Sequence, residues 1–425
     1  MWARRRYQPA PPAIRAAVKV GWRMEEVSER HGLAPSAVLF TCLFAAQAAL
    51  LVLSPILPQV AADFDVSTST AAQLRSVSGI TAGLFALVIA AKGKQVALSR
   101  LLKIGLFLLA GGALASAVSP TFLLLLASQV PLGLGLALVL SGALAASDVW
   151  AQGEEGAKLL SWALIGQPVA WIVGQPVVGA VAGVDWRWAW IAVPLGSSLA
   201  ALVAMAARRP TPDGPLECDP KGLWRQPHIK SWAWGELAAF SAWAGTLVFA
   251  GAFFIESYGA SVGETGLILG LVAAAYLPGN YLGRRLLRSV KAPTLLLAFA
   301  IAASVGVAIF GGLQPGVVFS LVALSILAFF AGGRTISGAA LGLRLADGRR
   351  LAAMSVRTAM LQFGYLFGSA IGGVMLPVWG FAGVGWTFAG LFAVAGAVHL
   401  QKATGAPGLA YENAGRYLRR GRLRV

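Results

Sequence analysis

Two charged side chains interrupt long apolar stretches of this sequence, Glu236 and Arg334. Charge inside a lipid bilayer is costly, so an ionisable residue there indicates a functional site. A glutamate that has lost its water can bind and release a proton near neutral pH, or it can reach the interface beside Arg225 and Lys230. Arg334 can anchor an anionic group of a bound solute, pair with Glu236, or bind helix carbonyl groups. The sequence leaves these alternatives open.

Two further charged residues lie near the ends of apolar stretches, Glu256 and Arg357. Glu256 stands at the opposite end of the stretch that contains Glu236. We therefore expect it at the membrane interface, with proton transfer or gating as the alternative role. Arg357 follows a polar segment by a few residues. Its long side chain can carry the guanidinium group to the aqueous surface, and we expect it to do so.

Eight uncharged polar side chains also lie within apolar stretches. In lipid their hydrogen bonds must be met by protein or by water in a cavity. Each of them either lines a cavity or joins neighbouring helices, and joining is the commoner role. Together with Arg334 they are the candidate residues of a substrate cavity: Gln47, Gln129, Gln167, Gln175, Tyr276, Asn280, Gln362 and Tyr365.

The tripeptide Gly-Gln-Pro occurs twice, at 166–168 and 174–176. A separation of eight residues puts both copies on one helix face, two turns apart. Each proline removes a backbone hydrogen bond and can kink the helix, whereas the glycines favour close packing. The pattern predicts a bent or closely packed helix at an interface, through Gly166, Pro168, Gly174, Pro176 and Gly179.

Composition predicts the elements that must position these side chains. Hydrophobic residues make up 57% of the 425 residues, charged residues only 12%, and glycine occurs 51 times. A soluble domain normally has about twice that charged fraction, and small residues let helices approach closely in lipid. We therefore expect an all-α polytopic membrane protein.

The apolar stretches divide into twelve predicted membrane spans. Three uncharged runs are about twice the length that crosses a bilayer, so each must turn once. We expect these turns at Ser119-Pro120, at 311–316 and around 377–385. The three runs are 104–147, 292–333 and 358–401, and the six single spans are 36–59, 76–91, 159–184, 188–207, 231–255 and 267–283.

Twelve spans separated by one polar linker predict two similar six-helix bundles, a known transporter plan. The predicted segments are a cytoplasmic N-terminal segment at 1–35 with an amphipathic helix at 13–30, a first bundle at 36–207, a linker at 208–230, a second bundle at 231–401 and a basic tail at 402–425.

The basic residues predict the orientation of these spans. Of the 34 lysines and arginines, all but Arg75, Arg187, Arg334 and Arg357 fall on the side of the termini. Arg75 and Arg187 are expected at the other face, and Arg334 and Arg357 within spans. Because cytoplasmic loops carry the excess of basic residues, this places both termini in the cytoplasm and the protein in the inner membrane. The net charge of +17 then needs no nucleic-acid partner.

Four stretches of the sequence resemble one transporter family. They are LSPILPQVAADFDVSTSTAAQL after the first span, VGQPVVGAVAG with VDWRWAW around the fifth, FFIESYGASVGETG before the eighth, and GGRTISGAALGLRLADGRRLAAMS from the tenth to the eleventh. They resemble the drug and sugar efflux branch of the major facilitator superfamily. The resemblance extends from Ser36 to about Gln401, and it implies alternating access between the two bundles.

The loop after the second span departs from that family's pattern. In AAKGKQVALSRLLKIG, Lys94 stands where the family has an acid, and Arg100 alone remains of the distal basic cluster. Asp148 matches the acid that usually ends the fourth span, whereas Ser128 replaces an arginine found in many antiporters. The 2–3 loop motif is therefore degenerate.

The resemblance implies a secondary active transporter, monomeric, that couples efflux of a small organic solute or drug to protons. A uniporter or importer is the alternative, favoured by the missing arginine, and a sensor, scaffold or lipid flippase of the same fold is another. No nucleotide-binding loop, zinc motif or catalytic triad is present, so we expect neither an enzyme nor a cofactor. The two cysteines, Cys42 and Cys218, indicate neither a disulfide nor a metal site.

Overall fold

The computed structural model describes residues 33–92, 97–151, 153–209, 220–347 and 349–400. The regular structure of these residues is helical, apart from an isolated bridge between Leu33 and Arg208. The amphipathic helix expected at 13–30, the basic tail and Lys94 lie outside the described residues. The all-α prediction is confirmed.

The first half of the chain contains nine named elements. Two spans are interrupted: α2 and α3 together form the first, and α8, the π-helix η2 and α9 form the sixth. The elements are α2 Pro35–Leu51, α3 Leu53–Asp63, α4 Thr68–Lys92, α5 Leu98–Ala117, α6 Phe122–Trp150, α7 Gly153–Ala182, α8 Trp186–Trp190, η2 Ile191–Leu195 and α9 Gly196–Ala206.

The second half consists of a short helix and five long ones. They are α10 Pro220–Trp224, α11 Ile229–Tyr258, α12 Val262–Leu286, α13 Ala292–Gly312, α14 Val317–Leu345 and α15 Arg350–Ala397. In α12 the helix start is fixed by a capping box, in which Ser261 and Glu264 satisfy each other's free backbone N–H groups.

Eleven of the described helical segments are long and apolar enough to cross a membrane. The last of them, Ala352–Ala397, has 46 residues, about twice the hydrocarbon thickness. It reverses at Gly380, whose φ of 61° and ψ of −164° are far easier for glycine than for other residues. The chain therefore makes twelve crossings, and the turns predicted near 119, 311–316 and 377–385 are confirmed.

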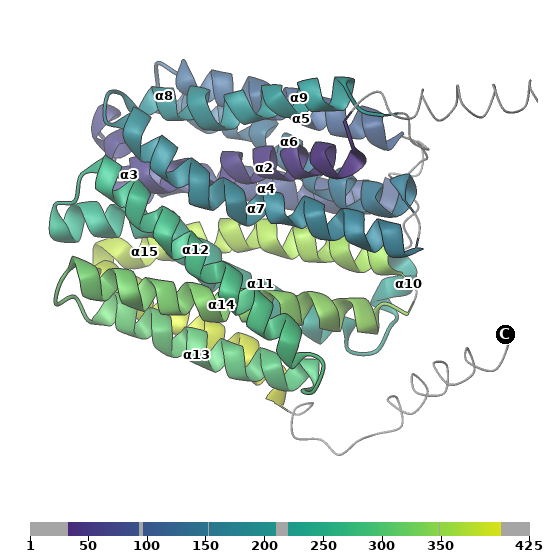
Figure 1. Ribbon diagram of the computed structural model, residues 1–425. Helices are drawn as coiled ribbons and strands as arrows, with labels where there is room; N and C mark the ends of the chain where they lie inside the picture. The colour runs from purple at the N-terminus through teal and green to yellow at the C-terminus, as the bar shows by residue number, and fades with distance from the viewer. Residues whose placement is uncertain (1–32, 93–96, 152, 210–219, 348, 401–425) are drawn as a thin grey trace, which may run out of the picture.

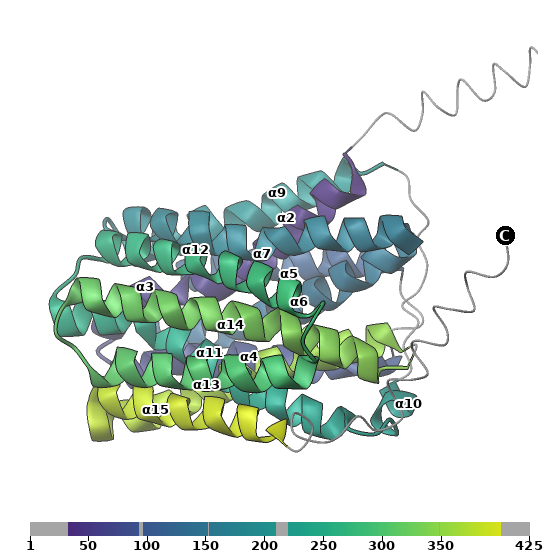
Figure 2. The same ribbon diagram turned by 60° about the horizontal axis from the view of Figure 1, so that its bottom comes forward.

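The two halves lie side by side, the first above the second in Figure 1. Leu33 bridges to Arg208, and His399 lies against Gly235, so the described chain begins and ends at one end of the bundle. We call this the terminal end and the opposite one the far end. Helices α7 and α12 meet near the far end and diverge toward the terminal end in both Figure 1 and Figure 2.

Glycines mark where the halves touch near the far end. A methyl group on Gly179 of α7 would stand 2.7 Å from the carbonyl oxygen of Val262 on α12. A methyl group on Gly251 of α11 would collide with the carbonyl group of Ser54 on α3. Backbones this close are in direct contact, so the halves are packed together at the far end.

Candidate functional site

A buried ion cluster joins three helices of the second half. Glu236 on α11 is fully buried, and its two carboxylate oxygens accept hydrogen bonds from different arginines. Arg334 on α14 lies 2.7 Å from Oε1, and Arg357 on α15 lies 2.9 Å from Oε2. Charge-assisted bonds of this kind are the strong ones in proteins. Two guanidinium groups and one carboxylate leave the cluster with a net charge of +1.

Each arginine of the cluster has a second anchor. Arg334 donates to the carbonyl oxygen of Gly235 at 3.0 Å, and Arg357 donates to that of Thr335 at 3.0 Å. Both guanidinium groups lie over the Phe240 ring, at 5.7 and 5.0 Å from its centroid. The expectation that Arg357 snorkels to the surface is wrong, because Glu236 and Thr335 draw its side chain inward, where it is 17% exposed.

The cluster also decides between the alternatives for its other members. Glu236 is not the interfacial carboxylate beside Arg225 and Lys230, since its partners are Arg334 and Arg357. Arg334 is the partner of Glu236 and also binds a helix carbonyl group. Arg334 is 3% exposed and bonded to Glu236, and an additional role as the anchor of an anionic solute stays a prediction.

A second buried cation lies at the seam between the halves. Arg75 on α4 is 1% exposed, so the expectation that it lies at the outer face is wrong. The helix begins at Thr68, seven residues earlier, which carries Arg75 into the bundle. Its Nη2 atom donates to the carbonyl oxygens of Ala49, at 2.9 Å, and Leu50.

The other half of the molecule contacts Arg75 through an aromatic ring. The guanidinium group lies over Tyr365 of α15, 6.0 Å from the ring centroid. Tyr365 is buried, and its hydroxyl group lies near the Gln47 side chain of α2. Three candidate or charged residues from α2, α4 and α15 thus meet where the halves join.

The comparisons with known proteins agree with this two-half architecture. The family model described as the Major Facilitator Superfamily matches residues 39–346, well over half of the chain. The chain belongs to the major facilitator superfamily. No curated protein matches the sequence.

Solved structures of the superfamily share the fold at low sequence identity. A D-xylose–proton symporter has a TM-score of 0.73 at 14% identity, over 86% of this chain and 96% of its own. A bacterial homologue of the human lysosomal transporter Spinster, inward-facing and occupied, has a TM-score of 0.69 at 17% identity, over 88% and 98%. The nucleoside transporter NupG has 0.67 at 13%, over 86% and 99%. These likenesses establish a transporter fold.

Two glutamines of this superfamily member donate hydrogen bonds to neighbouring helices, and their role in a cavity stays a prediction. Gln129 on α6 is fully buried and donates to Ser116 of α5 at 3.1 Å, inside the first half. Gln175 on α7 donates to the carbonyl oxygen of Leu51 at 3.1 Å, at the break between α2 and α3. Gln167 is half-buried on α7.

The remaining polar candidates belong to the second half. Tyr276 of α12 stacks on Trp243, with ring centroids 6.0 Å apart, and lies near Thr335 beside the ion cluster. Asn280, one turn further on, is half-buried. Gln362 of α15 is fully buried, and neither atom of its amide has a hydrogen-bond partner among the described residues.

Glu256 lies at the far end and connects the two halves. Its carboxylate accepts a hydrogen bond of 2.7 Å from the Thr68 hydroxyl group at the start of α4. Glu256 is exposed, as expected for an interfacial residue. Its position allows a gating role, which stays a prediction.

The glycines and prolines of α7 pack against both halves. Gly166 lies against the Phe40 carbonyl group and Gly174 against the Leu51 side chain, within the first half. Pro176 lies against Gly270, and Gly179 against Val262, across the seam. The helix continues from Gly153 to Ala182 through Pro168 and Pro176.

The family's loop residues are described only in part. Arg100 is exposed near the start of α5. Asp148 belongs to α6, but its side chain, like Lys94, lies outside the described residues. The departure of this loop from the family's motif is therefore known from the sequence alone.

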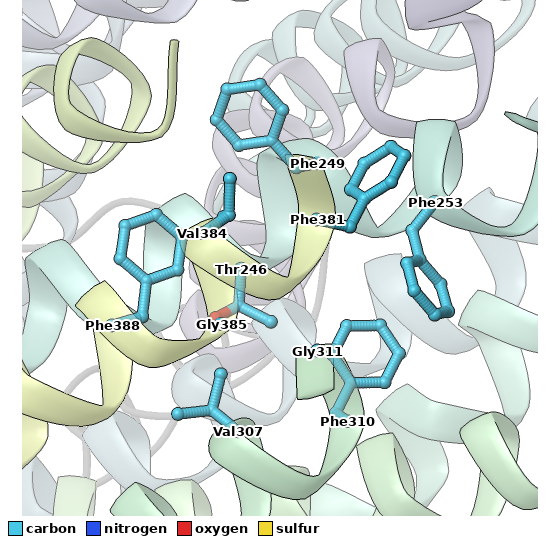
Figure 3. A pocket seen from close by; sticks show the side chains of 10 residues that line it. All are labelled: Thr246, Phe249, Phe253, Val307, Phe310, Gly311, Phe381, Val384, Gly385 and Phe388. Carbon is cyan, nitrogen blue, oxygen red and sulfur yellow. The ribbon is translucent and has the colours of Figure 1, made fainter. Parts of the chain in front are cut away.

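Figure 3 shows an aromatic pocket inside the second half, between α11, α13 and α15. Its volume of about 20 Å³ is room for roughly one water. No candidate site residue lines it, so we interpret it as a packing gap among rings. The lining residues are Thr246, Phe249, Phe253, Val307, Phe310, Gly311, Phe381, Val384, Gly385 and Phe388.

Sequence reasoning missed Arg75, Arg357 and Phe240 as parts of the buried polar core. For the two arginines the available signal was their position inside helices that begin earlier than hydropathy indicates, at Thr68 and Arg350. For Phe240, its place one turn after Glu236 was the signal, since residues i and i+4 share a helix face.

Proposed function

We propose that this transporter exports a small organic solute by alternating access and couples the movement to protons through Glu236. The observation that carries this proposal is the ion cluster. Among the described side chains Glu236 is the buried carboxylate, and one of its two arginines is more accessible than the other, at 17% against 3% exposed. When Arg357 turns toward water, Glu236 loses half of its neutralising charge and can accept a proton.

The direction and orientation of transport rest on sequence features. The efflux direction follows the resemblance of the fifth span and its neighbours to the efflux branch. The cytoplasmic placement of both termini and the inner-membrane location follow the distribution of basic residues. In support, Arg187 at the far end is paired with Asp63 at 2.9 Å, and Arg75, Arg334 and Arg357 are all turned into the bundle.

The test of coupling uses purified protein in liposomes that enclose a pH-sensitive dye. A solute found by a thermal-shift screen is added across an imposed pH gradient. We expect the solute to move protons, and we expect Glu236→Gln to abolish proton movement while solute exchange without a gradient persists. Solute transport that is indifferent to the gradient removes the coupling, and unchanged proton flux in Glu236→Gln assigns it to another residue.

A uniporter is the second candidate, and two observations favour it. Both carboxylate oxygens of Glu236 are bonded to arginines in this conformation. The position of the antiporter arginine is also occupied by Ser128, which is buried and bonded to Ser116 at 2.8 Å. Counterflow of labelled solute without any gradient, and without proton movement, identifies a uniporter. If no solute moves in either assay, the sensor, scaffold and flippase alternatives take its place.

A further inference from the structure

Arg75 is a buried cation without a carboxylate partner among the described residues. Its contacts are two backbone carbonyl groups and the face of Tyr365. Burying a charge is costly unless it is paired and hydrogen-bonded. The Arg334 and Arg357 cations share Glu236, whereas Arg75 has no such compensation.

A structural role accounts for one part of the Arg75 side chain. Nη2 binds the carbonyl groups of Ala49 and Leu50, where the first span is interrupted at Val52. The break lies three residues before Pro55, a residue that has no N–H to donate to the preceding turn. The Nη1 atom is different: it is buried and has no hydrogen-bond partner in the described part of the chain.

A second unpartnered polar group lies one helical turn from the Arg75 contact. Gln362 is fully buried, with both the nitrogen and the oxygen of its amide unpaired among the described residues. Its backbone oxygen faces Gly79, one turn along α4 from Arg75. Unsatisfied buried polar groups are rare in native proteins, and each requires an explanation. Other buried side chains also have an unpaired polar atom in the described part of the chain, Gln129 and Gln175 among them. Arg75 is the arginine of this group, and both amide atoms of Gln362 are unpaired one helical turn away.

The position of this seam fits a solute site. Tyr365 lies fifteen residues after Arg350 and fifteen before the reversal at Gly380, so it is about 22 Å along the helix from each end of its crossing. The contacts come from opposite halves: α2 and α4 from the first, α15 from the second. Binding near the midplane between repeats is where alternating access requires the solute.

We propose that Arg75 binds the anionic group of the transported solute, and hence that the substrates are organic anions carrying a carboxylate or phosphate group. Nη1 donates to the anion, and the Gln362 amide bonds a further polar group of the same molecule. A cationic solute would be repelled, and a neutral one would leave the charge uncompensated. The inference rests on the proposed transport function, and it concerns the substrate class rather than the proton site.

The test measures the local potential without requiring the natural substrate. Cys42 and Cys218 are replaced by alanine, and Gln362→Cys supplies a single thiol at the seam. The purified protein is treated with three methanethiosulfonate reagents of similar size: one bearing a sulfonate, one neutral and one bearing a trimethylammonium group. Each rate is divided by the rate of the same reagent with free 2-mercaptoethanol.

With Arg75 present, we expect the normalised rate of the sulfonate reagent to exceed that of the trimethylammonium reagent at least tenfold. Arg75→Lys should keep this preference, and Arg75→Gln should remove it. Arg187→Gln, which changes a far-end arginine already paired with Asp63, is the matched control and should leave it unchanged.

Two outcomes overturn the proposal: an anionic reagent that is not preferred when Arg75 is present, or a thiol at position 362 that no reagent reaches. If Arg75→Gln does not fold, the comparison of the sulfonate and trimethylammonium reagents in the protein that keeps Arg75 still tests the proposal. Failure of proton coupling in liposomes leaves the reagent preference intact, whereas loss of the preference in a protein that still transports refutes only the anionic substrate class.

Discussion

Arg334 and Arg357 hold the same carboxylate, but they differ in exposure. Removing one partner of a buried ion pair costs about 3–5 kcal/mol when the other charge is left unpaired, and less here because Glu236 keeps one arginine in either variant. We expect Arg334→Gln, at a side chain 3% exposed, to lower the unfolding temperature in detergent by more than Arg357→Gln. The more exposed Arg357 position admits water to replace the lost bond.

The control for this prediction is on the same helix. Arg344→Gln changes an exposed arginine in the last turn of α14. It should change the unfolding temperature by about a degree at most. The double variant Arg334→Gln with Glu236→Gln should be less stable than Arg334→Gln alone, because Arg357 then loses the carboxylate that it binds. Equal losses at positions 334 and 344 would show that the ion pair contributes nothing.

At the residue scale, the sequence offered the Glu236–Arg334 pair as one alternative and missed its third member. Glu236 lies six residues from Lys230, so hydropathy alone left an interfacial position open for it. Arg357 stands near a polar segment, and its direction depends on where the Glu236 carboxylate lies in space. Arg75 posed the same difficulty, since its carbonyl partners come from another helix.

The contact between α11 and α14 depends on a glycine. A methyl group on Gly338 would collide with the Glu236 carboxylate, and the Gly338 carbonyl oxygen accepts a 2.9 Å hydrogen bond from the Trp232 indole. We expect Gly338→Ala to push α11 away from α14 and to lower the unfolding temperature by several degrees. Gly390→Ala, where a methyl group meets nothing within 4 Å, is the matched control and should be neutral.

A stable Gly338→Ala protein would mean that α11 and α14 adjust at little cost, and the cluster would then not be rigid. If any glycine-to-alanine change in these helices were destabilising, Gly390→Ala would lower the unfolding temperature as much as Gly338→Ala. Alanine is intrinsically the better helix former, which makes the direction of the expected loss a specific sign of the clash.

At the element scale, the turns between helices were readable and the interruptions within spans were not. Ser119-Pro120 and the Gly-rich segment at 311–316 combine strong breakers with an impossible helix length. The break at Val52 and the π-helix at 191–195 accompany single prolines. Pro168 and Pro176 lie in a continuous helix, so a proline alone does not predict which outcome occurs.

Glycines contact the opposite half at several places, including the far end of the molecule. Gly179→Ala places a methyl group 2.7 Å from the Val262 carbonyl oxygen across the seam. We expect this substitution to shift the population toward conformations in which the far end is open. Spin labels on cysteines at Ser67 and Gln314, in two far-end loops, would report a longer mean distance by pulsed electron resonance.

Gly111→Ala is the control for this experiment, because a methyl group there meets nothing within 4 Å. It should leave the distance distribution unchanged. An unchanged distribution in Gly179→Ala would show that the seam repacks locally and does not bias the two halves. The two-half plan itself followed from span count and linker position, whereas the closed far end depends on contacts between residues 179 and 262 that no single sequence reveals.

An unneutralised guanidinium group within the bilayer also makes the molecule sensitive to electrical potential. One elementary charge crossing 100 mV changes the free energy by about 2.3 kcal/mol. The empty transporter carries the Arg75 charge through its conformational cycle, whereas a bound anion would cancel it. Membrane voltage would therefore change the rate at which the empty transporter returns more than the rate of the loaded step. The membrane potential of the cell would then control the turnover rate.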